Sequence, residues 1–296
     1  MNTFHLPNET HLSRVHLRTG NLARALDFYQ RGIGLQVFDR SQVAVTISAT
    51  ASAPAILVLT EDPNAVHRPQ RATGLNHLAI RFPTRGDLAH ALVRLVKASY
   101  PISGGSDHPF GCSIYLDDPD GNGVELYFDL PRSQWPARRN GLIVLAGNAP
   151  LDFDQLLASV DGDAVPAHAA AGTDMGHINL HVPDLAAAET FYRDFLGFEV
   201  TAHIGPGGRF LATGGYHHHI AINNWAGKTP APKNAVGLIS YRLTVPNGET
   251  LAVLEDRARL LGQEVRMADD ILQIRDPNGN WLELEAVPQT AAVAAL

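Results

Sequence analysis

Histidine is the residue type in this chain most able to do chemistry, with 14 among 296 residues. Three of them stand together, His217 to His219, directly ahead of Ile220. An imidazole can bind a transition metal or move a proton near neutral pH, because its ordinary pKa is about 6.5. The single cysteine, Cys112, excludes a thiolate cluster, so a metal would need nitrogen and oxygen ligands. Metal binding and proton transfer are therefore the chemistries to test, against the alternative of a surface strand with adventitious metal-binding histidines.

Internal repetition shows which elements must position these residues. Residues 21–37 return as 184–200, and the turn 118–125 returns as 276–283, where both copies read Asp-Pro-x-Gly-Asn and end in glutamate. Similarity of this kind indicates duplicated structural units. We predict the following organisation: a first domain at 10–130, a linker with a short helix at 131–173, a second domain at 174–288 and a tail at 289–296.

Each half is itself predicted to contain two smaller units. In the second half, 177–182 alternates apolar and polar residues like a strand, and Asp184 precedes a helical pattern that ends at Gly197. Three strand-like runs follow, at 198–203, 209–213 and 217–222. The same order recurs from 240 to 286. The sequence thus predicts an α+β fold built from four βαβββ units.

Composition excludes several classes of function. Hydrophobic residues make up 45% of the chain and charged residues 18%, which suits a globular protein with a packed core. The net charge of −7 and the lack of a basic run argue against a nucleic-acid partner. The apolar runs fall short of the roughly 20 residues of a bilayer helix, and residues 1–18 show no signal-peptide pattern. We therefore expect a cytoplasmic protein with no membrane partner.

The order of motifs resembles the vicinal oxygen chelate superfamily of glyoxalases, bleomycin resistance proteins and extradiol dioxygenases, and within it the two-domain catechol 2,3-dioxygenases. The resemblance covers both halves and rests on a strand, Asn-Leu or Asp-Leu, Phe-Tyr, and the Asp-Pro-x-Gly-Asn turn followed by a strand glutamate. It implies tandem vicinal oxygen chelate domains whose units pair into cupped, mixed or antiparallel sheets. Because this superfamily hosts unrelated chemistries, activity has to be argued from the site.

The resemblance also implies metal ligands on the first and last strands of the units. The first-strand positions are Arg14, His77, His177 and Ser240. The last-strand positions are near Leu57, at Glu125, near His218 and at Glu283. An extradiol centre needs two histidines and one carboxylate on ferrous iron. Arg14 and Ser240 each stand where a histidine ligand is needed, so neither half has two histidines and a carboxylate at these positions. We therefore expect a metal site across the halves, at His77, Glu125 and His177. The rival set is His177, His218 and Glu283.

Three catalytic residues are implied by the same resemblance. His218 is the expected acid and base, and strand alternation places it on the face opposite to His217 and His219. Tyr115, four residues before the turn proline, is expected to steady the substrate oxygen. His108 is expected to hydrogen-bond the substrate. The implied reaction is extradiol cleavage of a catechol by O2, with Fe(II) or alternatively Mn(II) as the metal, giving a muconic semialdehyde.

Other functions fit the same motifs. A glyoxalase-type lyase or isomerase would use a metal but no oxygen, and a resistance protein would bind an aromatic drug without a metal. Alternatively, His77 and Glu125 form a buried hydrogen-bonded pair with no metal. In each case, exposed strand edges favour a homo-oligomer.

Overall fold

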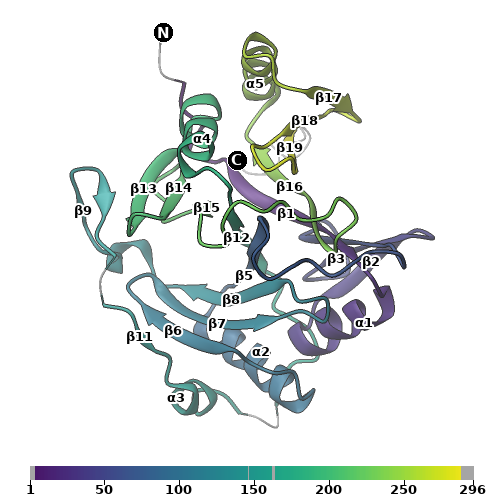
Figure 1. Cartoon of the computed structure of the whole chain (residues 1–296). Helices are drawn as coiled ribbons and strands as arrows, with labels where there is room; N and C mark the ends of the chain where they lie inside the picture. Colours follow the sequence, from purple (N-terminus) through teal and green to yellow (C-terminus); the bar gives the residue numbers. More distant parts are fainter. Residues whose placement is uncertain (1–3, 146, 162–163, 288–296) are drawn as a thin grey trace, which may run out of the picture.

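The computed structural model describes residues 4–145, 147–161 and 164–287. The predicted tail at 289–296 lies outside these residues. Over the described chain, helices and strands follow one another as four βαβββ units, so the predicted α+β fold is confirmed (Figure 1).

Each unit starts with a long strand, continues with a helix and ends with three further strands. Unit one comprises β1 (His11–Thr19), α1 (Leu22–Asp27) with a π-helical turn (Phe28–Ile33), β2 (Gln36–Arg40), β3 (Ala44–Ser48) and β4 (Leu57–Glu61). Unit two comprises β5 (Gly74–Phe82), α2 (Arg85–Lys97), β6 (Gly104–His108), β7 (Gly111–Asp117) and β8 (Gly123–Asp129). Unit three comprises β12 (Asp174–His181), α4 (Leu185–Thr190) with a π-helical turn (Phe191–Phe195), β13 (Glu199–Ile204), β14 (Gly208–Ala212) and β15 (Ile220–Asn223). Unit four comprises β16 (Gly237–Val245), α5 (Gly248–Leu260), β17 (Val265–Ala268), β18 (Ile271–Arg275) and β19 (Trp281–Ala286).

Short elements connect units two and three. They are a 3-10 turn (Arg132–Gln134), β9 (Arg138–Arg139), β10 (Leu142–Ile143), β11 (Ala149–Pro150) and α3 (Phe153–Leu157). β9 and β10 pair with each other, and β11 adds to the edge of unit two by pairing with β6. α3 lies against α2, and Asp152 caps its N-terminus by accepting a hydrogen bond from the backbone N–H of Gln155.

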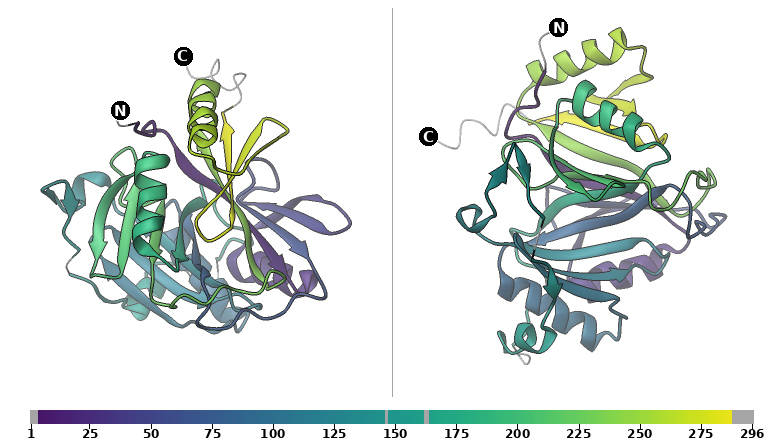
Figure 2. Two further views of the ribbon diagram at one scale, coloured as in Figure 1. Left: turned by 45° about the horizontal axis from the view of Figure 1, so that its top comes forward. Right: turned by 60° about the vertical axis from the view of Figure 1, so that its left-hand side comes forward.

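The sheets join units from different halves of the sequence. Within the described residues, β17-β18-β19-β16-β1-β4-β3-β2 form one sheet, here called the one–four sheet. A second sheet, the two–three sheet, has the order β11-β6-β7-β8-β5-β12-β15-β14-β13. The halves meet through the antiparallel pairs β1–β16 and β5–β12, each made by the first strands of two units. Figure 2 shows purple and yellow segments, from opposite ends of the sequence, side by side in one sheet.

The repeated turn motif holds the two sheets together. Asp118, in the turn between β7 and β8, accepts hydrogen bonds from the backbone N–H groups of Asp120 and Asn122. Its other oxygen accepts one from the hydroxyl of Tyr29, 3.0 Å away, in the helical turn of unit one. The second copy is equivalent, since the Tyr192 hydroxyl of unit three donates to Asp276 of unit four at 3.2 Å. Each Tyr–Asp bond therefore connects one sheet to the other.

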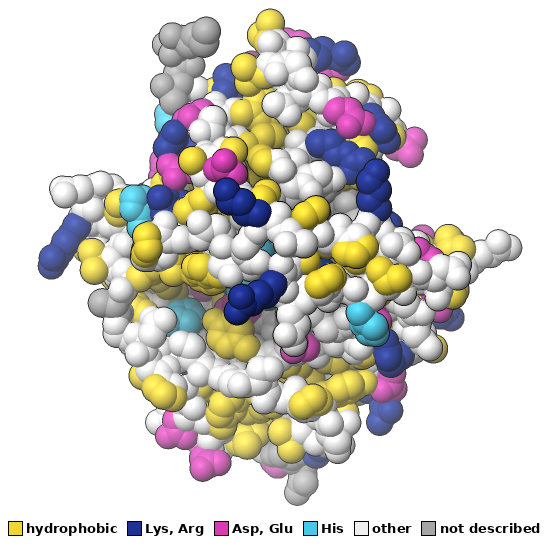
Figure 3. All heavy atoms as spheres, in the orientation of Figure 1, with side chains coloured by type: hydrophobic (Ala, Val, Ile, Leu, Met, Phe, Trp, Pro, Cys, Tyr) yellow, Lys and Arg dark blue, Asp and Glu magenta, His cyan; other side chains and the backbone are white. Residues whose placement is uncertain are grey.

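The outer surface carries charges of both signs. On the face in Figure 3, Lys and Arg side chains are interspersed with Asp and Glu side chains. Among the described residues, no helix is long and apolar enough to cross a membrane.

The Tyr–Asp bonds generate a stability prediction. Tyr29→Phe should lower the free energy of unfolding by about 1–2 kcal/mol, and Asp118→Ala by about 2–4 kcal/mol because it also strips buried N–H donors of their acceptor. Urea denaturation measures both. The double variant should lose less than the sum, since the two residues share one bond; strict additivity would contradict the proposed linkage.

Candidate metal centre

Three neighbouring strands of the two–three sheet bring the expected metal ligands together. His77 lies on β5, Glu125 on β8 and His177 on β12, and β5 pairs with both of the other strands. Ala79 of β5 is the register partner of both Glu125 and His177. His77 stands two residues before Ala79 and so shares its face of the sheet. The small side chain of Ala79 leaves room between the outer ligands.

The three ligand atoms converge on one point. Nε2 of His77 and Nε2 of His177 each lie 3.1 Å from Oε2 of Glu125. Among the described residues, these side chains form a group of potential ligands whose atoms all lie within 4.8 Å of one another. Two ligands at right angles on a metal with bonds of about 2.1 Å stand about 3.0 Å apart, so the donor set fits a metal ion. Three ligands leave other coordination positions open.

The three candidate ligands differ in how far their side chains are buried. The His177 side chain is 2% exposed and that of Glu125 is 6% exposed, whereas His77 is 16% exposed. Burial alone raises the pKa of Glu125, but the neighbouring imidazoles of His177 and His77 hold it well below the ordinary value. Burial lowers the pKa of His177. Burial thus favours the neutral form of His177 beside the Glu125 carboxylate, and these are the forms that a metal requires of such ligands.

Ser113 fixes the orientation of the carboxylate. Its hydroxyl, on β7, donates to Oε1 of Glu125 at 2.6 Å, which leaves Oε2 to face the histidines. Nε2 of His108 lies 2.9 Å from the same hydroxyl oxygen. His108 therefore connects to the centre through Ser113. Ser113 was not among the residues expected from the sequence, although it lies two residues before Tyr115 and so on the same strand face.

Tyr115 lies beside the centre. It is the register partner of Glu125, and its ring centroid lies 6.1 Å from that of His77. Burial and the charge of Glu125 raise the pKa of Tyr115, so the phenol keeps its proton. A protonated phenol can donate a hydrogen bond to an oxygen bound at this position.

The expected strand over 217–222 is wrong at its start. β15 begins only at Ile220, and the three histidines lie in the irregular segment ahead of it, so strand alternation does not apply to them. His217 and His218 are not on opposite faces, because their Nδ1 atoms lie 2.7 Å apart. Glycines at 214 and 215 with positive φ let the chain turn here.

His218 nevertheless reaches the centre. Its ring centroid lies 4.1 Å from that of His177, and it stacks on Phe210 with the ring centroids 3.8 Å apart. Burial holds the pKa of His218 well below its ordinary value. His217 lies behind it and pairs with Asp129, at 2.9 Å between Nε2 and Oδ1. The sequence alone gave His217 no role and did not point to Asp129. For Asp129, the available signal was its spacing of four residues from Glu125 along β8.

The rival metal set is not assembled. Glu283 lies on β19 of the one–four sheet, whereas His177 lies on β12 of the other sheet. Guanidinium nitrogens of Arg14 and Arg242 lie 2.8 Å and 2.7 Å from Oε2 of Glu283, and Ser240 donates to Oε1 at 3.0 Å. Arg14 thus stands where the other sheet has His177, and Ser240 stands where it has His77. The two guanidinium charges beside Glu283 would repel a metal cation.

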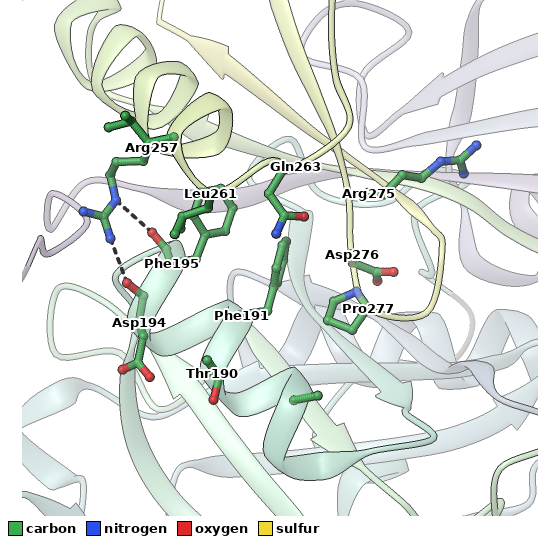
Figure 4. Close-up of a pocket in the computed structure, with 12 residues that line it drawn as sticks. Thr190, Phe191, Asp194, Phe195, Arg257, Leu261, Gln263, Arg275, Asp276 and Pro277 are labelled. Carbon is green, nitrogen blue, oxygen red and sulfur yellow. Dashed lines mark hydrogen bonds between the residues drawn. The ribbon is translucent and has the colours of Figure 1, made fainter.

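A large cavity lies away from the candidate centre. It has a volume of about 870 Å³ and lies between α4 and α5 (Figure 4). Apolar side chains such as Phe191, Phe195 and Leu261 dominate its lining, and Arg257 at its edge donates to the backbone carbonyl oxygens of Asp194 and Phe195. None of the expected catalytic or metal-binding residues lines this cavity.

Comparison with known proteins shows which family this chain is similar to. A model described as the "Glyoxalase/Bleomycin resistance protein/Dioxygenase superfamily" matches residues 11–126 and 174–284. The "Catechol-2,3-dioxygenase" of Bacillus subtilis (strain 168) is 38% identical over 273 residues, which cover 91% of this chain and 94% of that protein.

Solved structures show the same fold at lower identity. The crystal structure of a putative dioxygenase from Bacillus subtilis superposes with a TM-score of 0.67 at 14% identity, covering 94% of this chain and 85% of that one. Glyoxalase I from Zea mays superposes with a TM-score of 0.57 at 15% identity, covering 93% and 92%. At these identities the likeness concerns the fold alone.

The guanidinium-bound carboxylate predicts a pH-dependent contribution to stability. Burial raises the pKa of Glu283, but the charges of Arg14 and Arg242 overcome this and hold the pKa below its ordinary value of 4.5. Glu283→Gln should therefore cost about 2–4 kcal/mol at neutral pH, since it leaves buried guanidinium groups without a counter-charge. Urea denaturation of both proteins measures the difference.

The sign of the pH effect follows from linkage. A carboxyl with a lowered folded-state pKa stabilises the fold above its unfolded-state pKa, and this contribution disappears as the pH falls through the folded-state pKa. The stability difference between the native chain and Glu283→Gln should thus shrink below about pH 4. A difference that stays constant from neutral to acid pH would refute this assignment.

Proposed function

Because the chain belongs to the Glyoxalase/Bleomycin resistance protein/Dioxygenase superfamily, we propose that it is an extradiol dioxygenase of the catechol 2,3-dioxygenase type. It would cleave a catechol ring next to the two hydroxyls with O2 and release a muconic semialdehyde. The convergence of His77, Glu125 and His177 carries this proposal, since two imidazoles and one carboxylate with open positions suit oxygen-activating non-haem Fe(II). The 38% identity to a catechol-2,3-dioxygenase supports it.

The metal would be held by Nε2 of His77, Nε2 of His177 and Oε2 of Glu125. When bound, it supplies a Lewis acid that lowers the pKa of the catechol hydroxyls and an open position for O2. We propose Fe(II), with Mn(II) as the alternative that the same ligand types accept. Ser113 keeps the second carboxylate oxygen occupied, so Glu125 offers one oxygen to the metal.

The chain's own side chains would handle the proton and the substrate oxygen. His218, in ring contact with His177, is the proposed proton acceptor and later donor. Tyr115, next to His77, would donate a hydrogen bond to a substrate oxygen and stabilise its negative charge. For His108 we propose substrate contact through Nδ1, because Nε2 is already engaged with Ser113. His77, the most exposed ligand, marks the side from which substrate enters.

Location and assembly belong to the same proposal. We propose a cytoplasmic homo-oligomer with no membrane or nucleic-acid partner. Within the part of the chain that the structure describes, the end strands of the sheets, such as β2 and β13, pair on one side only and suit edge-to-edge association. Light scattering after size-exclusion chromatography measures the mass of the assembly.

The decisive experiment uses protein purified without oxygen, loaded with Fe(II), mixed with catechol and then exposed to air. We expect stoichiometric oxygen uptake together with the visible absorbance of a ring-opened semialdehyde. His77→Ala and His177→Ala should each lose bound iron and reduce turnover by at least about 100-fold, because each removes a metal ligand. His203→Ala, which changes an exposed histidine on β13, is the matched control and should retain both.

Two outcomes would overturn the proposal in different directions. Bound iron without oxygen uptake across several catechols would favour a glyoxalase-type lyase or isomerase. Absence of stoichiometric metal, with tight binding of an aromatic compound, would favour a resistance-type binding protein.

A further inference from the structure

A chain of buried side chains leads away from the proposed acid and base. Nδ1 of His218 faces Nδ1 of His217 at 2.7 Å, and Nε2 of His217 faces Oδ1 of Asp129 at 2.9 Å. The His217 side chain is 2% exposed, and that of Asp129 is 12% exposed. His217 and Asp129 are not among the candidate metal ligands, and the reaction described above gives them no role.

The distances determine where the protons are. Two Nδ1 atoms 2.7 Å apart share a single proton, because two protons would clash and none would leave two lone pairs facing each other. Asp129 accepts a hydrogen bond from the Tyr216 hydroxyl at 2.7 Å and lies 3.5 Å from a guanidinium nitrogen of Arg81. Burial raises the pKa of Asp129, but His217, Tyr216 and Arg81 hold it below the ordinary value, so the group is a carboxylate.

A carboxylate can only accept a hydrogen bond, so His217 carries its proton on Nε2. In a neutral imidazole the other nitrogen then has a lone pair, and Nδ1 of His217 accepts from Nδ1–H of His218. Nε2 of His218 is left with the free lone pair. The order of donors and acceptors along the chain thus selects one tautomer of His218.

We propose that Asp129 and His217 are positioning residues that hold His218 in the tautomer with a basic Nε2, ready to take a catechol proton. The role rests on the proposed dioxygenase function, in which that proton must leave the substrate. When Nε2 of His218 takes the proton, the ring becomes a cation whose Nδ1–H still donates to His217. Asp129, beyond His217, supplies the balancing negative charge, and the proton returns to the product by the same nitrogen.

The surrounding structure keeps the chain of side chains in place. Asp129 follows Glu125 by four residues on β8, so one strand aims one carboxylate at the metal site and the other at His217. Phe210 stacks on His218 at 3.8 Å with the rings 5° from parallel, and Phe110 packs on His217 with ring centroids 4.9 Å apart. The aromatic faces exclude water and restrict rotation of both imidazoles.

The tautomers can be measured directly by ¹⁵N NMR of histidine-labelled protein loaded with diamagnetic Zn²⁺, with His217→Gln and His218→Gln used to assign signals. We expect a proton on Nδ1 of His218 and on Nε2 of His217. Asp129→Asn should change the tautomer of His217, because an amide can also donate. A native His218 protonated on Nε2 would overturn the proposal, whatever reaction the protein catalyses.

Kinetics of the Fe(II) enzyme provide the second arm. Asp129→Asn should lower kcat by about 100-fold or more, as expected when an acid–base histidine is held in the wrong tautomer, while iron content and KM stay close to native values. The fold reduction in kcat should be smaller with a nitro-substituted catechol, because its hydroxyl ionises without a base to take the proton. Asp174→Asn, which changes another carboxylate that binds Arg81, is the matched control and should keep native kcat.

The results separate the two proposals. An unchanged kcat in Asp129→Asn, or an equal loss for catechol and nitrocatechol, would refute the positioning role alone. Absence of oxygen uptake by the native enzyme would refute the dioxygenase function, while the NMR result would still decide the tautomer of His218.

Discussion

A buried glutamate on the last strand of a unit is the constraint around which both sheets are arranged. An ionised carboxylate removed from water must be met by donors or positive charge. In the two–three sheet, Glu125 is met by two imidazoles and the Ser113 hydroxyl. In the one–four sheet, Glu283 is met by two guanidinium groups and the Ser240 hydroxyl. A neutral imidazole has a nitrogen lone pair that can bind a metal ion and a guanidinium group has none, so of these two arrangements only the first could hold a metal.

The pairing of units across the halves explains how ligands from both halves can form one candidate metal centre. His77 and His177 belong to different halves, and they face each other because β5 and β12 are antiparallel neighbours. The Tyr–Asp bonds then tie each half together across the two sheets. Stability and site geometry are therefore coupled through the same repeated motifs: the tyrosine and the turn aspartate hold the sheets together, and the glutamate that follows the first turn belongs to the candidate metal site.

Much of this arrangement could be predicted from the sequence, because the periodicity of apolar residues predicts strands and helices and the repeat identifies equivalent residues. The resemblance to vicinal oxygen chelate proteins implied the ligand positions, and Arg14 and Ser240 at two of them left His77, Glu125 and His177 as the expected set. The segment 217–219 could not be predicted in the same way. Two glycines and a chain turn precede β15, so strand alternation fails there, and the contact between His217 and His218 depends on irregular backbone.

The sequence by itself determined the α+β fold and the repeat, because these follow from local patterning and from motif order, and its resemblance to a known family implied the residue types of the candidate metal site. Only the tertiary structure decided which further side chains contact Glu125 and His218. Ser113 matters because the register of β7 on β8 sets it against Glu125, and Asp129 because His217 folds back onto the end of β8. Hydrogen bonds between residues distant in sequence depend on sheet register and loop path, and these are set by packing of the whole chain rather than by any local pattern.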